Sequence, residues 1–132
     1  MIQRIQTVFL ALASICGILL LFIPSFSVGP LKATMSDETI YTIFVIAISL
    51  FPVFTIMMYN NRPQQIRFGF ISISLVFAVC AAFMFMERDY LSYITLELGA
   101  ALPMLMIIFN LLAIRAIKKD EELVRSADRF RD

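Results

Sequence analysis

The chain has 132 residues, of which 61% are hydrophobic and 16% are charged, and its formal net charge is +1. Soluble globular domains average about 45–50% apolar residues, so this composition indicates a membrane protein, and the small net charge argues against a general nucleic-acid binder. The sequence contains no histidine, the commonest metal ligand and general base, and we expect neither an enzyme nor a bound metal or cofactor.

Four apolar runs follow one another along the chain, at residues 5–23, 40–59, 68–86 and 94–114. Each run holds about twenty residues, which makes roughly 30 Å of helix, enough to cross the core of a bilayer. The pattern therefore predicts four transmembrane helices. The first run is longer than the apolar core of about 7–15 residues in a signal peptide, so we expect it to be a true span.

The connections between the second, third and fourth runs are short, and short connections make consecutive helices antiparallel neighbours. We therefore predict an all-α, up-down-up-down bundle of four transmembrane helices that forms one membrane domain over residues 1–132.

The basic residues indicate the orientation of the chain in the membrane. All of the 11 Lys and Arg residues except Lys32 and Arg88 lie before the first run, between the second and third, or after the fourth. Positively charged loops stay in the cytoplasm, so we expect both termini on the cytoplasmic side of the membrane.

Asn110 is the most strongly polar residue in the interior of the predicted spans, since the acid Glu97 falls in the first turn of the fourth run, close to the membrane surface. An amide in hydrocarbon needs a hydrogen-bond partner, and such a bond between helices contributes on the order of 0.6–2 kcal/mol. We interpret Asn110 first as forming a hydrogen bond between helices. The alternatives are that it contacts a substrate along a transport path or bonds to a partner subunit.

The segment from Arg115 to Asp132 is rich in charge and has no Gly or Pro, so we expect the fourth helix to continue into the cytoplasm. Arg115, Lys118 and Lys119 would lie at the lipid headgroups, where each basic charge contributes about 1 kcal/mol on an anionic leaflet. The later part, 120–132, is either a frayed solvated end or a helix that docks Leu123, Ala127 and Phe130 on a partner or on the second connection.

The candidate residues for contact with lipid or a partner are therefore Arg4, Arg115, Lys118, Lys119, Leu123, Arg125, Ala127, Arg129 and Phe130.

The two ends of the chain, "MIQRIQTVFL" and "LLAIRAIKKDEELVRSADRFR", carry distinctive motifs. They resemble an uncharacterised family of small four-helix membrane proteins from Bacteroidota, catalogued as domain of unknown function 4293. The resemblance extends over the whole chain and implies an inner-membrane protein with no assigned activity. It supplies no catalytic residues.

Two functions remain open. The first is a non-catalytic accessory subunit of a larger inner-membrane complex, such as a protein-export or energy-transducing assembly, that docks through its cytoplasmic face and tail. The alternative is a small homo-oligomeric transporter or channel. The expected partners are membrane lipids and other inner-membrane subunits, with self-association left open.

Overall fold

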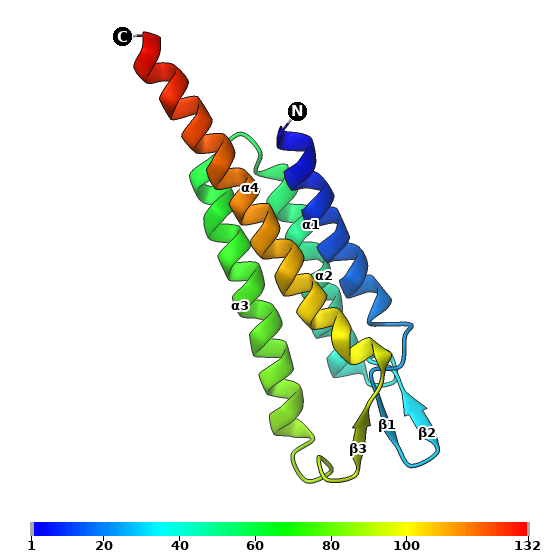
Figure 1. Ribbon diagram of the computed structural model, residues 1–132. Helices are drawn as coiled ribbons and strands as arrows, with labels where there is room; N and C mark the ends of the chain where they lie inside the picture. The colour runs from blue at the N-terminus through cyan, green and yellow to red at the C-terminus, as the bar shows by residue number, and fades with distance from the viewer. Residues whose placement is uncertain (1, 132) are drawn as a thin grey trace.

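The computed structural model describes residues 2–131, with side chains from Ile5 onward. The elements in chain order are α1 (Ile2–Leu19), β1 (Phe26–Val28), β2 (Leu31–Ala33), α2 (Thr39–Met57), α3 (Arg62–Met86), β3 (Ile94–Leu96), the 3-10 helix η1 (Leu98–Ala101) and α4 (Leu102–Arg131). Figure 1 shows an elongated bundle of four helices, with the strands at one end and both chain termini at the other.

The four predicted helices are present, and consecutive helices alternate in direction (Figure 1). The first helix packs against α2 and α4, and α3 packs against the same two helices. Within the described residues, α2, α3 and the segment Leu98–Arg131 are long and apolar enough to cross a membrane, and α1 is apolar but shorter.

A small antiparallel sheet corrects the all-α prediction. Its strand order is β2-β1-β3. The central strand β1, which follows α1, therefore pairs with β3, which lies at the start of the fourth apolar run. The hydroxyl groups of Ser27 and Thr95 hydrogen-bond between β1 and β3. An apolar run does not by itself distinguish a strand from a helix, which explains why residues 94–96 were predicted to be helical.

A tight turn joins β1 to β2 at Gly29-Pro30. Gly29 has φ +62°, a conformation that L side chains rarely adopt, and the ring of the following proline holds φ negative. This combination is typical of a type II′ hairpin turn, whose twist matches that of the paired strands.

Two helix boundaries also differ from the sequence predictions. The first helix ends at Leu19 rather than at Ile23: the next residues tighten into turns, with hydrogen bonds from the Leu21 N–H to the Ile18 carbonyl and from the Phe22 N–H to the Leu19 carbonyl, and Pro24 disfavours helical geometry at Ile23. The third helix begins at Arg62 rather than at Phe68, since Asn61 caps its end by accepting a hydrogen bond from the Gln64 backbone and Pro63 suits its first turn.

A close approach between helices occurs where Gly17 of α1 meets α2 and α4. A Cβ atom placed on Gly17 would lie 2.2 Å from Oγ of Ser49 and 3.1 Å from Cε of Met106. Beside it, Oγ of Ser14 donates a hydrogen bond of 2.6 Å to the carbonyl oxygen of Ser49. Pro52 lies one turn further along α2, and because it has no N–H, the carbonyl of Ile48 lacks its usual helical donor.

We predict that Gly17→Ala destabilises the bundle by about 1–3 kcal/mol, because the added methyl group must displace Ser49. The measurement is the thermal unfolding midpoint in mild detergent, followed by circular dichroism. Ser49→Gly should reduce the cost of Gly17→Ala, and Ile18→Ala, at a half-exposed neighbouring position, serves as the control. If Gly17→Ala lowers the unfolding midpoint equally with and without Ser49→Gly, the contact between Gly17 and Ser49 does not limit stability.

Candidate interaction site

The end of α4 projects beyond the other helices (Figure 1). The helix has 30 residues, which corresponds to about 45 Å. It continues to Arg131, as the absence of Gly and Pro after Pro103 predicted. An ion pair of 2.9 Å between Glu121 and Arg125, one turn apart, contributes to its stability.

The base of this projecting segment is attached to the first residue of α3, where the connection between α2 and α3 ends. Nη2 of Arg62 lies 3.1 Å from Oδ2 of Asp120, and the two side chains are 27% and 13% exposed. The contact is an ion pair without hydrogen-bond geometry, since Oδ2 of Asp120 has no hydrogen-bond partner among the described residues. Its partial burial reduces screening by solvent, so it holds the direction of α4 more firmly than a fully exposed pair would.

A polar groove of about 450 Å³ adjoins this ion pair, lined by Tyr59, Asn60, Asn61, Arg62, Pro63, Glu121, Val124 and Arg125. One sequence hypothesis placed Leu123, Ala127 and Phe130 on this connection. The structure instead turns Glu121, Val124 and Arg125 toward it.

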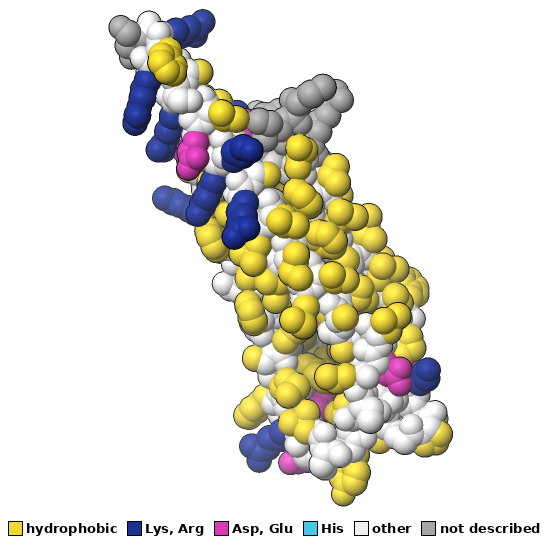
Figure 2. Space-filling model, in the orientation of Figure 1, with side chains coloured by type: hydrophobic (Ala, Val, Ile, Leu, Met, Phe, Trp, Pro, Cys, Tyr) yellow, Lys and Arg dark blue, Asp and Glu magenta, His cyan; other side chains and the backbone are white. Residues whose placement is uncertain are grey.

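The basic residues at the bundle end of this segment, Arg115, Lys118 and Lys119, are exposed. Figure 2 shows basic side chains gathered on this end of the molecule, above a face covered by hydrophobic side chains. Nζ of Lys118 lies 5.4 Å from the ring centroid of Phe70 on α3, a cation–π contact that contributes about 0.5–1 kcal/mol at an exposed site.

The other candidate contact residues lie on the projecting helix and are open to solvent. Leu123 is 48% exposed and Phe130 is 92% exposed. Arg125, Ala127 and Arg129 are exposed as well. The structure therefore leaves an apolar and basic helical surface without a packing partner in the described part of the chain. Arg4 belongs to α1, but its side chain lies outside the described residues.

Asn110 is completely buried, with 0% exposure. Its Nδ2 donates a hydrogen bond of 2.8 Å to the carbonyl oxygen of Met106, one turn earlier in the same helix. Its Oδ1, like Oγ of Ser72 and Nε2 of Gln6, has no hydrogen-bond partner among the described residues. The side chain thus bonds within α4, whereas the sequence interpretation placed the bond between helices.

The ion pair of Arg62 with Asp120 was missed by the sequence analysis. The available signal was weak: opposite charges occur just beyond the ends of adjacent predicted spans. The residues described by the structure include no group of three or more Cys, Asp or Glu side chains that could hold a metal ion.

The family model described as Domain of unknown function (DUF4293) matches residues 2–130. The chain belongs to this family. The resemblance drawn from the two terminal motifs is confirmed in that respect. No curated protein and no solved structure matches this DUF4293 chain.

We predict that Asp120→Ala loosens the projecting helix, because it leaves Arg62 without its partner and removes about 0.5–1 kcal/mol of stabilisation. Trypsin cleavage after Arg125 in the detergent-solubilised protein should become roughly two- to five-fold faster, since cleavage follows the open population. Asp128→Ala, at an exposed position, is the matched control.

Arg62→Ala should have the same effect, and the double variant should be no more sensitive than either single variant. Equal acceleration by Asp128→Ala, or none by Asp120→Ala, would show that the ion pair does not hold the helix.

Proposed function

We propose that this DUF4293 protein is a non-catalytic accessory subunit of a larger complex in the bacterial inner membrane. It docks on its partner through the projecting end of α4. The observation that carries this proposal is the exposure of Leu123 and Phe130 on a helix that extends beyond its own bundle.

The composition of this surface suits a protein partner. Phe130 lies between Arg129 and Arg131, and aromatic and Arg side chains are enriched at the centres of protein interfaces. Burial of Phe130 and Leu123 by a partner would remove apolar surface from water, at about 25 cal/mol per Å². The ion pair at Asp120 fixes the direction of the helix in advance, which lowers the entropy lost on binding.

Membrane insertion with both termini in the cytoplasm is part of the same proposal. The apolar length of α2, α3 and α4 supports insertion. The orientation rests on the distribution of basic residues: Lys32 and Arg88 lie at the sheet end, and the described basic clusters lie at the opposite end (Figure 2).

Labelling of single cysteines tests the orientation. In a Cys16→Ala, Cys80→Ala background, Leu31→Cys reports the hairpin and Ser126→Cys reports the projecting helix; both positions are exposed. A membrane-impermeant maleimide should label Leu31→Cys in intact spheroplasts and Ser126→Cys only after lysis. The reverse pattern would invert the topology, and labelling of both in intact cells would indicate dual insertion.

Affinity purification in mild detergent tests the docking surface. With a tag inserted at the 29–30 hairpin turn, the full chain should retain a stoichiometric membrane complex identified by mass spectrometry. A version that stops after Lys119 should lose it. The double variant Leu123→Ala, Phe130→Ala should reduce recovery about ten-fold or more, because central apolar contacts dominate binding energy.

The matched control is the double variant Glu122→Ala, Asp128→Ala, which changes two exposed charged residues of the same helix. It should retain the complex. Recovery of the protein alone, as one discrete oligomer with or without residues 120–132, would rule out the accessory-subunit proposal.

The second candidate is a small homo-oligomeric transporter or channel. Its support is the set of buried polar atoms, in Gln6, Ser72 and Asn110, that have no hydrogen-bond partner among the described residues. Flux through proteoliposomes that is abolished by Asn110→Leu, with the helical content unchanged, would favour this function over docking.

A further inference from the structure

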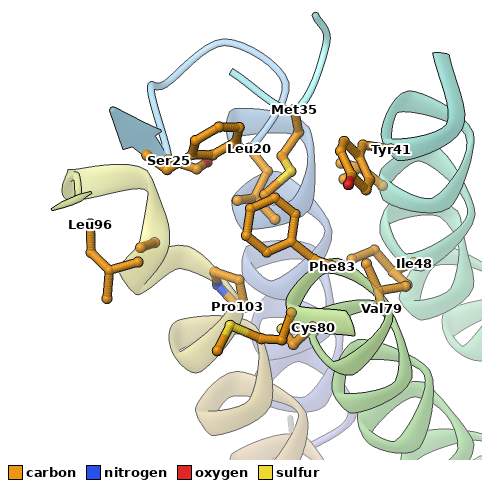
Figure 3. Close-up of a pocket in the computed structure, with 14 residues that line it drawn as sticks. Leu20, Ser25, Met35, Tyr41, Ile48, Val79, Cys80, Phe83, Leu96 and Pro103 are labelled. Carbon is orange, nitrogen blue, oxygen red and sulfur yellow. The ribbon is translucent and has the colours of Figure 1, made fainter. Parts of the chain in front are cut away.

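A cavity of about 190 Å³ lies at the sheet end of the bundle, between α2, α3 and the start of α4. Its wall includes side chains from the sheet, from α2, α3 and η1, and from the start of α4, among them Phe26, Tyr41, Cys80, Phe83, Ala100 and Pro103. Figure 3 shows Phe83 at its centre, with Cys80 facing Pro103 across the lower part and Leu96 at one side.

The lining is almost entirely hydrocarbon, sulfur and aromatic ring. The Phe83 ring packs on Phe26 and Tyr41, with centroid separations of 5.1 and 5.3 Å. The Tyr41 hydroxyl is directed to Oε1 of Glu87, at 2.6 Å, and so does not offer a free donor to the cavity. A wall of this kind cannot give a water molecule the two to four hydrogen bonds that it needs.

Cavities of this kind and size take up apolar molecules. An engineered cavity of about 150 Å³ lined by Leu, Ile and Phe stays dry and binds benzene or xenon. The cavity at the sheet end is slightly larger, so an occupant made of hydrocarbon suits it in both volume and chemistry.

The cavity is open on the side where α3 and α4 separate. These helices touch closely at their other end, where a Cβ on Gly69 would lie 2.7 Å from Ile114. They diverge toward the sheet (Figure 1), and Figure 2 shows a hollow in the apolar face near that end. Met84 and Leu96 line the cavity and are 51% and 76% exposed, so the mouth is bordered by apolar side chains.

The depth of the cavity suits the upper part of a lipid chain. Cys80 lies six residues before Met86, the last residue of α3, which places it roughly 9 Å from that end of the helix. If α3 spans the bilayer, the mouth faces hydrocarbon, where acyl chains are present at far higher concentration than any other apolar ligand.

We propose that the cavity binds one acyl chain of a phospholipid from the leaflet on the sheet side. This inference rests on the proposed membrane insertion but not on the proposed docking partner. The upper part of the chain lies between α3 and α4, past Met84 and against Phe83 and Cys80, and its remainder continues into the bilayer. The headgroup stays outside, level with the sheet.

Native mass spectrometry of the full chain, purified from membranes and stripped with excess detergent, tests this site. The protein should retain one phospholipid. Ala100→Phe fills the cavity from η1 and should reduce the lipid-bound fraction at least five-fold. The control Ala81→Phe adds the same ring at an exposed position next to Cys80, outside the cavity lining, and should leave retention unchanged.

A second filling variant, Cys80→Phe, reaches the same space from α3. It keeps the test valid if Ala100→Phe does not fold. Circular dichroism confirms that each variant is folded. Absence of a retained phospholipid in the unmodified protein, or equal retention in the folded filling variants, would overturn the proposal.

Fluorescence gives an independent readout, because the chain contains no tryptophan. Met84→Trp introduces one at the mouth of the cavity, and brominated phospholipid should quench it with a saturable phase that Ala100→Phe abolishes. Quenching that rises only in proportion to brominated lipid, with or without Ala100→Phe, would indicate ordinary annular contact and overturn the site.

The outcome is separable from that of the docking proposal. Lipid retention without a co-purifying complex supports lipid binding in the cavity and rules out the proposed docking partner. If no lipid is retained and a thiol crosslinker joins Cys80 to a second protein, the cavity is filled by a side chain of that partner, and the lipid proposal is overturned.

Discussion

The close contact of α1 with α2 and α4 at Gly17 is the constraint on which the other elements depend. Because Gly17 has no side chain, Ser49 and Met106 can approach the α1 backbone directly. The chain then leaves α1 through Pro24, whose carbonyl oxygen accepts a hydrogen bond of 2.9 Å from the backbone of Gly99. A contact in the first helix therefore sets where α4 begins and, through a straight helix, where its far end lies.

The helices were predictable because their apolar runs are long and are bounded by Pro or by charge, and the continuation of α4 was predictable because nothing after Pro103 breaks a helix. The hairpin had a local signal in Gly29-Pro30, but β3 had none, since Ile94–Leu96 is merely the start of an apolar run. The ion pair of Arg62 with Asp120 depends on the rotation of α4 about its axis relative to the α2–α3 connection. That rotation is a property of packing between helices distant in sequence, and so is the cavity around Phe83.

The two ends of the molecule have different chemistry. One end presents a charged helix with exposed Leu123 and Phe130, and the other surrounds an apolar cavity with a small sheet. Between them lies the buried amide of Asn110, whose one hydrogen bond among the described residues is to Met106 of its own helix. An accessory subunit with such ends would meet protein on one side of the membrane and lipid on the other, with the bundle as the rigid body between them.

The uninterrupted length of α4 has a mechanical consequence. Its first turn contains Pro103, which borders the cavity, and its last contains Phe130, and no Gly or Pro lies between them to absorb bending. Because the helix is about 45 Å long, a tilt of roughly 5° at the cavity would displace the other end by about 4 Å, roughly three-quarters of the rise of a helical turn. A helix of this length would act as a lever arm, converting a small change in what fills the space beside Pro103 into a larger displacement of Phe130 at the opposite end of the bundle.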